Sequence, residues 1–546
     1  MLNHKRSALS LALAVVLAPT LASAQSTQST TTPAGTAATN LDTVQVTGIR
    51  RGIENAIAIK QDATSVVEAI SAEDIGKLPD VSIAESISRL PGLAAQRVAG
   101  RAQVISVRGL SPDFATTLLN GREVVSTGDN RGVEFDQYPS ELVNGVTVYK
   151  TPDAALVGQG LSGTIDMQTA RPLSFGERVI AVSGRYQKSS LGRAANVDPY
   201  GNRFSASYID QFLDKTLGIA IGYAHSDMPI QENQVGLYEP WTTEHTDKGD
   251  RPGVGAGTYF SDGIKALRRT GNNKRDGVMA TIQFRPNNSW TSTFDAFHTE
   301  AEQIDTANQF ELNLSNYNGN YTPGLLVSNP QVNANGSFTG GTASGVYPLV
   351  RGMYNKRKDK IDAFGWNNEF NFSGIKLVAD LNYSKATRDE LNLENNLQLT
   401  PMPQLDTVGV SIRQNGFSQI SPGLNYSNPD ALFLTNTIYG SGYGKVPQVE
   451  DRLKGGKLAA TIALPEAIAS WAPDIDIGVN YADRRKVKTQ SEGNILLGAQ
   501  GDANIAADLQ YRPVNLGFAG LGTIPAWDVP AAVARYMTFN PVDNLD

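Results

Sequence analysis

The chain has 546 residues, with 47 Lys plus Arg against 54 Asp plus Glu and a formal net charge of −7. Nucleic-acid phosphates attract basic surfaces, so an acidic chain of this kind is not expected to have a nucleic-acid partner. It contains no cysteine, which excludes a disulfide scaffold, a thiolate metal site and a cysteine nucleophile.

The first 24 residues have the pattern of a secretory signal peptide. Lys5 and Arg6 precede an apolar run at residues 9–17, and Ala22, Ser23 and Ala24 form a small-residue cleavage site. A membrane anchor is the alternative, but this run is about half of the roughly 20 residues that a spanning helix needs. Export is therefore expected, and removing the two basic residues changes the net charge from −7 to −9.

Residues 25–40, QSTQSTTTPAGTAATN, are low in complexity and too polar to form a core, so a flexible linker is expected there. Residues 41–48, LDTVQVTG, follow directly. They contain strand-forming valines and threonines, yet no neighbouring segment can pair with them. An unpaired strand on a flexible tether is suited to join another protein's sheet edge through main-chain hydrogen bonds. Because LDTVGV recurs at 405–410, the position of residues 41–48 carries the prediction more than their sequence does.

Residues 49–175 have the signals of a compact α/β domain. A strand is predicted at 65–70, followed by two helices with capping pairs at Ser71/Asp74 and Ser82/Glu85. Pro91 and Gly92 end the second helix. Further strands are predicted at 103–110 and 115–125, the latter folded at an Asn120-Gly121 hairpin turn. A brief helix after residue 139 leads to strands at 145–152 and 163–169.

From residue 176 to about 485, apolar and polar side chains alternate as in strands with two different faces, and residues 486–546 are expected to form another loop. Leu377, Leu381 and Tyr383 share one face, whereas Lys376 and Asp380 share the other. About nine such strands are expected, beginning near residues 178, 203, 217, 277, 290, 365, 376, 456 and 475.

The spacing of these strands favours an outer-membrane barrel. Short links at 285–289 and 373–374 alternate with polar segments of about fifty residues, whereas a soluble sandwich, the alternative, has a turn every 8–12 residues. Tyr223, Tyr383 and Tyr481 are expected to end strands at an aromatic girdle. Plugged transporters have 22 strands. We therefore expect an incomplete, C-terminally truncated antiparallel transmembrane β-barrel at 176–546.

Three segments, LPDVSIAESISRLPGLAAQR, VISVRGL and TTLLNGREV, carry a resemblance to TonB-dependent outer-membrane receptors. AEDIGKLPD at 72–80 narrows the resemblance to a large subgroup common in proteobacteria that live on plant and environmental carbohydrates. The resemblance implies a barrel closed by a plug domain, an extracellular ligand site, outer-membrane lipid around the barrel, and energy supplied through TonB and its inner-membrane complex.

Position by position, the resemblance assigns two kinds of site. The TonB box that contacts TonB corresponds to Asp42, Thr43, Val44, Gln45, Val46 and Thr47. The RG motif and the hairpin turn correspond to Arg108, Gly109, Asn120 and Gly121. The chain departs from the family pattern at Lys150, Thr151 and Pro152, where many members have lysine, glycine and proline, and at Val157 and Gly158, where many have tyrosine and glycine.

A plug must seal at rest and move under load, so its contact with the wall is expected to be polar and wet. Arg122 and Glu123 suit this contact together with Arg89, Arg97 and Arg101. For Arg108 we expect a plug–wall ion pair that holds the gate, with an ordinary solvated arginine at a strand end as the alternative.

Candidate ligand contacts lie in two plug loops expected to face outward, 99–103 and 126–134, and in the long loop after residue 237. They are Arg101, Asp129, Asn130, Arg131, Tyr238 and Trp241. Turn formation explains the plug-loop residues equally well. For Tyr238 and Trp241, ordinary packing is the more common role of isolated loop aromatics. The resemblance favours a carbohydrate oligomer over a ferric siderophore as the ligand.

Enzyme signatures are absent from the sequence. His225, His245 and His298 have no partner at metal or triad spacing, and GQGLSG at 158–163 lacks the lysine of a phosphate loop. No catalytic residue, metal or cofactor is expected. Active import is therefore the first hypothesis, with a ligand-sensing signalling receptor and a passive barrel or adhesin without energy coupling as alternatives.

Overall fold

The computed structural model describes residues 47–71, 82–98, 101–158, 160–239, 241–243, 251–315, 324–399 and 404–543. The predicted signal peptide, the linker, residues 41–46 and the predicted helix after Ser71 lie outside these ranges. Within the described ranges, no helix is both long enough and apolar enough to cross a membrane.

The N-terminal domain, residues 47–175, is an α/β unit, as predicted. Its helices and strands are α2 (Thr47–Asp62), β1 (Val67–Ser71), α4 (Ile83–Ile87), β2 (Leu93–Val98), β3 (Arg101–Val107), β4 (Ala115–Leu119), β5 (Arg122–Glu123), β6 (Gly145–Tyr149) and β7 (Gly163–Gln168). One sheet has the order β1-β6-β7-β4-β5, in which only β4 and β7 run parallel, and β2 and β3 form a separate hairpin. Because α2 begins at Thr47, the last two residues of the predicted extended segment 41–48 are helical instead.

Two local predictions in this domain have different outcomes. Asn120 and Gly121 have φ values of 54° and 75°, so the tight turn between β4 and β5 is confirmed. Ser82 does precede α4, but the predicted side-chain cap is wrong, since its Oγ donates to Ala102 O at 3.3 Å. Packing holds this short helix instead, because Ile83 and Ile87 are fully buried in the domain core.

Nine long antiparallel strands form the large sheet in the described part of the chain, which confirms the predicted number. They are β8 (Val179–Lys188), β9 (Tyr200–Phe212), β10 (Leu217–Leu237), β11 (Gly263–Asn287), β12 (Trp290–Asn313), β15 (Leu349–Phe372), β16 (Ile375–Leu399), β20 (Gly442–Ala463) and β21 (Asp474–Leu497). They pair in chain order, and the short strands β19 (Leu432–Leu434), β22 (Ala503–Asn504), β25 (Met537–Phe539) and β26 (Val542–Asp543) extend the sheet.

Three of these strands begin well before the predicted positions. β11, β15 and β20 start at residues 263, 349 and 442 rather than near 277, 365 and 456. Their first halves are rich in Lys, Arg, Asp and Asn, so apolar alternation is missing, yet ladder hydrogen bonds to both neighbours keep them extended. The long connections are correspondingly shorter than fifty residues. Tyr223, Tyr383 and Tyr481 therefore lie within strands and do not end them.

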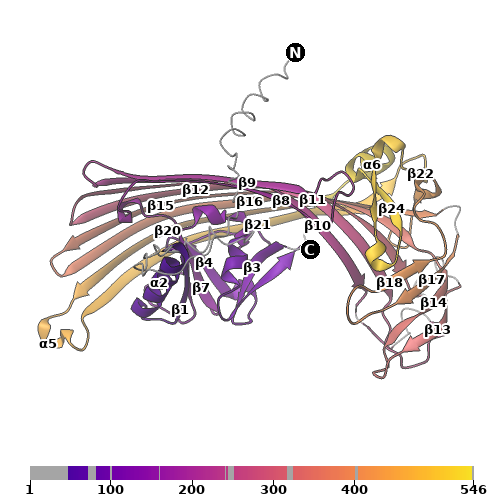
Figure 1. Ribbon diagram of the computed structural model, residues 1–546, viewed down its shortest axis with the longest axis horizontal. Coiled ribbons are helices and arrows are strands. Elements are labelled where there is room, and N and C mark those ends of the chain that lie inside the picture. The colour runs from indigo at the N-terminus through magenta and orange to yellow at the C-terminus, as the bar shows by residue number, and fades with distance from the viewer. Residues whose placement is uncertain are drawn as a thin grey trace, which may run out of the picture. The chain divides into compact units, whose positions relative to one another are not determined.

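At the end of the large sheet where the connections are long, the chain builds a second core. A four-stranded sheet contains β13 (Leu326–Val332), β14 (Phe338–Val346), β17 (Asp406–Ser411) and β18 (Gln419–Pro422), and β23 (Gln510–Asn515) pairs with β24 (Thr523–Trp527). Helix α6 (Val529–Tyr536) packs beside them, with Trp527 fully buried in this core. At the other end, α5 (Glu466–Ala469) lies in the connection between β20 and β21 (Figure 1).

Candidate functional site

The N-terminal domain lies against one face of the large sheet (Figure 1). We call this the wall face. Side chains of alternate residues point toward the domain, among them Met279, Asp295, Phe297 and Ile361, while their neighbours point to the opposite face. Charged pairs and apolar contacts both cross between domain and wall.

Arg122, just after the hairpin turn, is the centre of the first charged contact. Its Nε and Nη2 each lie 2.8 Å from an oxygen of Asp380 on β16, and its Nη1 lies 2.7 Å from Asp295 Oδ2 on β12. Burial by itself would lower the pKa of Arg122, but the two carboxylates outweigh that effect and raise it. A side chain at Gly365 on β15 would overlap the guanidinium, so the glycine leaves room for it.

Hydrogen bonds with Asp166 and Thr169 hold the hairpin turn to the rest of the domain. Gly121 N donates to Asp166 Oδ1 at 2.9 Å, and Thr169 N donates to Asn120 Oδ1 at 2.9 Å. Burial raises the pKa of Asp166, more than its hydrogen bonds lower it. These contacts fix the direction in which Arg122 leaves the turn and reaches the wall.

Glu123 begins a second contact, with β20 and β21. Arg484 Nη1 donates to Glu123 Oε1 at 2.7 Å, while Nη2 of the same guanidinium lies 2.6 Å from Asp451 Oδ2. The backbone N–H of Ser126 also donates to Asp451, at 3.1 Å. Asp451 is fully buried, so the charge needs these partners.

Glu134 makes a third contact, nearer the end of the sheet with long connections. It accepts two hydrogen bonds from Arg388 on β16, at 2.8 and 2.5 Å, and Arg388 Nε also donates to Asp359 at 2.6 Å. Burial would raise the pKa of Glu134, but Arg388 and Arg357 together hold it below its ordinary value. Gln137 donates to Asp359 at 2.8 Å and ties the same carboxylate to the domain.

The interface between the N-terminal domain and the wall also has an apolar part, which differs from the prediction of a polar and wet contact. The ring of Tyr138 stacks on Phe297 of β12, with centroids 5.2 Å apart. Met279, Ile361 and Leu453 of the wall belong to the same buried cluster as the core of the N-terminal domain. Burial of these side chains adds hydrophobic attraction to the ion pairs, because water is excluded from both surfaces.

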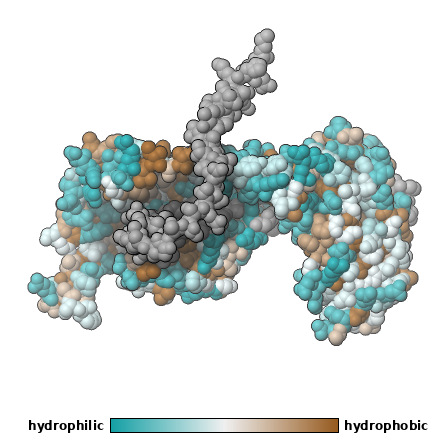
Figure 2. Space-filling model, in the orientation of Figure 1, coloured by the Kyte–Doolittle hydropathy of each residue, from teal (hydrophilic) through white to brown (hydrophobic). Residues whose placement is uncertain are grey.

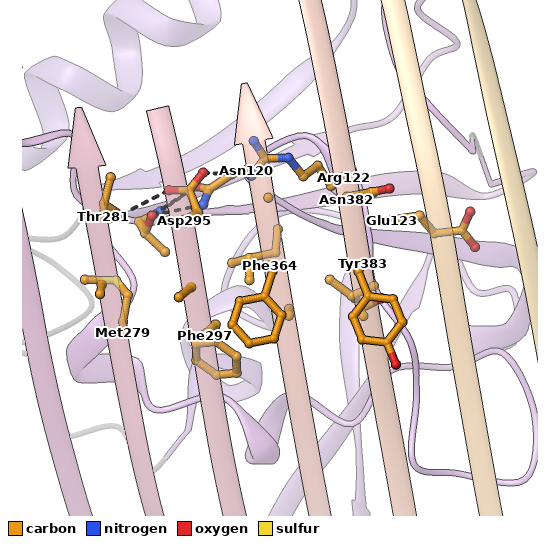
Figure 3. A pocket seen from close by; sticks show the side chains of 18 residues that line it. Asn120, Arg122, Glu123, Met279, Thr281, Asp295, Phe297, Phe364, Asn382 and Tyr383 are labelled. Carbon is orange, nitrogen blue, oxygen red and sulfur yellow. Dashed lines mark hydrogen bonds and ion pairs between the residues drawn. The ribbon is translucent and has the colours of Figure 1, made fainter. Parts of the chain in front are cut away.

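A small cavity lies between the hairpin turn and the wall (Figure 3). Its volume of about 30 Å³ is enough for one or two water molecules. Figure 3 shows Arg122 and Asp295 directed toward each other there, with the rings of Phe297, Phe364 and Tyr383 further along the strands. Asn382 Oδ1 and Ser384 Oγ, which belong to two lining residues, are buried and have no hydrogen-bond partner in the described part of the chain. Water in this cavity would supply the missing partners.

Arg108 is placed differently from the prediction of a plug–wall ion pair. It has a positive φ of 54°, and its Nε donates to Ser162 O at 3.1 Å within the N-terminal domain. Gly109 follows with φ 76°. These two residues form the turn that ends β3, so their positions are set by backbone geometry rather than by contact with the wall.

The predicted ligand residues do not form one cluster. Arg101 is largely buried and lies 3.7 Å from Asp136, so it does not face outward as predicted. Asp129 is exposed and pairs with Lys488 of β21 at 2.6 Å, and Asn130 and Arg131 beside it are exposed. Tyr238 and Trp241 are half-buried after β10, where the Tyr238 hydroxyl contacts Glu311 and lies 3.0 Å from the Tyr439 hydroxyl. Of the predicted TonB-box residues, only Thr47 falls within the described ranges.

The wall partners were not predicted from the sequence; they are Asp295, Asp380, Asp451, Arg388 and Arg484. A signal for them does exist, because each is a charged residue on the polar face of an alternating strand. The pattern indicates a face that avoids lipid. It does not indicate which residue of the N-terminal domain each one meets, since that depends on how the two parts pack.

Comparison with known proteins identifies the N-terminal domain. Residues 59–165 match the family model for the TonB-dependent receptor plug domain. A ferric enterobactin receptor mutant from Pseudomonas aeruginosa is 11% identical, with 84% of this chain and 80% of that chain covered at a TM-score of 0.31. The outer membrane transporter YddB from Escherichia coli is 9% identical, with 80% and 76% covered at a TM-score of 0.32.

Proposed function

Residues 59–165 are a TonB-dependent receptor plug domain, and from this premise we propose that the chain imports a scarce ligand across the outer membrane. In this proposal the ligand binds at the end of the sheet with long connections. TonB then pairs with residues 41–48 and pulls, and the plug rearranges against the wall. Proton-motive force supplies the energy, and no covalent chemistry takes part.

The face of the large sheet opposite the plug supports the outer-membrane placement. Large apolar side chains cover it, including Ile221, Ile282, Leu381, Leu458 and Val479, each exposed by 44% or more. Figure 2 shows such apolar residues, in brown, along the margin of the large sheet. Residues of this kind suit contact with lipid tails.

Aromatic residues border this apolar band on both sides. Near the short connections, Trp290 stacks on Phe370 with centroids 6.3 Å apart. Six residues further along β15, Phe364 lies beside Tyr383 of β16. At about 3.3 Å per residue the two levels are roughly 20 Å apart, close to the lipid-facing height of outer-membrane barrels.

The ion pairs of Arg122, Glu123 and Glu134 support a plug that stays closed at rest. Each joins the plug to a different pair of strands in the wall. Removing one partner of a buried ion pair costs about 3–5 kcal/mol, so three such contacts rarely separate together without an external force. Thermal motion therefore leaves the plug in place, and opening needs the pull.

We propose a carbohydrate oligomer as the ligand, in preference to a ferric siderophore. The subgroup resemblance favours a carbohydrate. The charged side chains on the wall face near the long connections also favour it. There Asp305 pairs with Arg269 at 2.6 Å, Glu492 pairs with Lys445 at 3.3 Å, and Arg351 lies between Glu311 and Glu394. Four carboxylates and three basic side chains take part in these pairs, so their charges nearly cancel, which suits a neutral ligand more than a highly charged one. Asp129, Asn130 and Arg131 are the proposed plug contacts.

Uptake by cells tests the proposal. A deletion strain is complemented with one of four genes: the wild type, a variant lacking residues 41–47, Val44→Pro or Val44→Thr. Each strain is given labelled oligosaccharides and labelled ferric siderophores. Main-chain pairing predicts that Val44→Thr imports normally, whereas Val44→Pro loses a backbone donor and imports poorly. Unchanged uptake after deletion of residues 41–47 would exclude TonB coupling. Uptake of iron complexes without any saccharide uptake would exclude the proposed ligand class.

A further inference from the structure

A cavity of about 380 Å³ lies on the face of the large sheet opposite the plug, toward the end with long connections. Thr270 and Asn272 of β11 and Thr306 of β12 contribute to its floor. In register they have the opposite parity from Met279 and Phe297, which pack on the plug core. The cavity is therefore separate from the proposed import path.

The cavity has a roof that is fixed in place by side chains. Arg268 donates to Leu191 O at 2.9 Å and to Asn233 Oδ1 at 2.7 Å, and Gln231 donates to Gly192 O at 2.6 Å. These bonds hold the loop between β8 and β9 over the sheet. An isolated β-bridge between Ala195 and Arg512 then joins that loop to β23. The volume falls in the range of small-molecule sites, roughly 300–1,000 Å³.

Three tyrosines from distant segments line the cavity: Tyr200 of β9, Tyr354 of β15 and Tyr511 of β23. Aromatic rings pack against the apolar faces of pyranose sugars, and tyrosine also offers a hydroxyl. Tyr200 is 43% exposed, and the other two are half-buried. The roof and floor thus present aromatic surface to one shared space.

Polar groups for sugar hydroxyls accompany these rings. Asn272 donates to Asp227 at 3.2 Å through Nδ2, while its Oδ1 is buried and has no partner in the described ranges. The hydroxyls of Thr270 and Thr306 lie 3.5 Å apart beside it. Among the described residues, the lining includes two carboxylates, Asp198 and Asp305, and no lysine or arginine, so it does not favour a phosphate or another anion.

We propose that this cavity is a second ligand site, which binds a neutral saccharide on the outer side of the wall. The ligand would be a soluble oligosaccharide or the sugar portion of a glycolipid in the surrounding leaflet. Both present the same ring faces and hydroxyls. The site does not depend on TonB coupling, so its test and the uptake test fail independently.

The test is calorimetric titration of the full chain in lauryldimethylamine oxide, a detergent without a sugar headgroup that would compete. The probes are maltohexaose, cellohexaose, xylohexaose and the core oligosaccharide released from rough lipopolysaccharide. Tyr511→Ala removes a roof ring and Asn272→Ala removes the unpaired amide oxygen. Tyr511→Phe keeps the ring and is the matched control, and melting curves check that each variant is folded.

We expect at least one probe to bind, with a Kd that rises about tenfold or more in Tyr511→Ala and in Asn272→Ala. Tyr511→Phe should stay within about threefold of the wild type. Binding of the core oligosaccharide alone assigns the site to leaflet glycolipid, and binding of the linear hexaoses assigns it to soluble glycans. Equal affinity in wild type and both alanine variants, or no binding of any probe at about 10 mM, overturns the proposal.

Discussion

Arg122 of the plug and Asp380 of the wall are 258 residues apart in sequence and form a two-pronged ion pair. Asp295 takes the remaining Nη1 at 2.7 Å, and all three side chains are about one-tenth exposed. One guanidinium therefore neutralises carboxylates on two strands of the wall. Its position depends on a hairpin turn with two positive φ values.

Replacing Arg122 with alanine should loosen the plug strongly, because the nearly buried Asp380 loses its counter-charge and Asp295 keeps only its ion pair with Arg171. We expect a loss of about 3–5 kcal/mol, the usual result of breaking a buried pair from one side. Protease susceptibility of the plug in the full chain, measured against denaturant, gives the change. Lys376→Ala, which removes a half-exposed pair with Glu369, should cost less than about 1 kcal/mol and is the control.

The triple variant Arg122→Ala, Asp295→Asn, Asp380→Asn removes the charges together. It should be more stable than Arg122→Ala alone, since no buried carboxylate is left without a counter-charge, and Arg171, which loses Asp295, is about one-third exposed to solvent. A triple variant as loose as the single one would show that shape or hydrogen bonding, rather than charge balance, gives Arg122 its effect.

Gly121→Ala tests the hairpin turn itself. A Cβ there meets nothing within 4 Å, so its cost is backbone strain at φ 75° and should be about 1–2 kcal/mol. Gly176→Ala is the matched control, because that glycine also has open space but no positive φ. Thermal melting of the two variants compares them. Equal melting temperatures would mean that the turn relaxes without cost.

Acidification should weaken the plug contact at Glu134. Burial raises the pKa of this carboxyl, but Arg388 and Arg357 of the wall lower it more, so its stabilising contribution is complete above the unfolded value of about 4.3 and is lost as pH falls through the lower folded value. Burial raises the pKa of Asp136, which has the opposite effect on stability. Comparing the wild type with Glu134→Gln isolates Glu134.

The difference in protease resistance between these two proteins should be largest near neutral pH and shrink between about pH 5 and pH 3. A difference that stays constant over this range would show that Arg388 holds Glu134 through hydrogen bonding alone, without a change in its charge.

The parts of the fold that sequence could predict are those set by local chemistry. The Asn120-Gly121 turn follows from the need for positive φ, and the nine long strands follow from alternation on a two-faced sheet. The first halves of β11 and β15 could not be predicted from alternation. Backbone hydrogen bonds to neighbouring strands keep them extended, and these bonds do not depend on the side chains.

Only the plug residues of the candidate site could be predicted from the sequence. Arg122 and Glu123 follow from the turn that precedes them, but their partners come from strands hundreds of residues away. Arg108 was assigned to the wall, yet it bonds within the plug, because its positive φ turns the chain back at the end of β3. Arg101 was expected to face outward, but it is largely buried and lies 3.7 Å from the buried Asp136.

The order of strands in the plug predicts where a pull from TonB would act first. β1 is an edge strand of five residues, paired only with β6 in the described ranges and joined directly to α2. Force on residues 41–47 would reach β1 before any ion pair of Arg122 or Glu134.

Cysteines at Ala69 and Thr147, which face each other across β1 and β6, can be oxidised to a disulfide because opposite residues in antiparallel strands lie within bonding range. The oxidised variant should bind ligand normally but import almost none, and reduction should restore import. A disulfide between Val327 and Ala343 of β13 and β14 is the control and should leave import unchanged. Normal import by the oxidised Ala69–Thr147 variant would mean that β1 stays paired with β6 while the ligand passes.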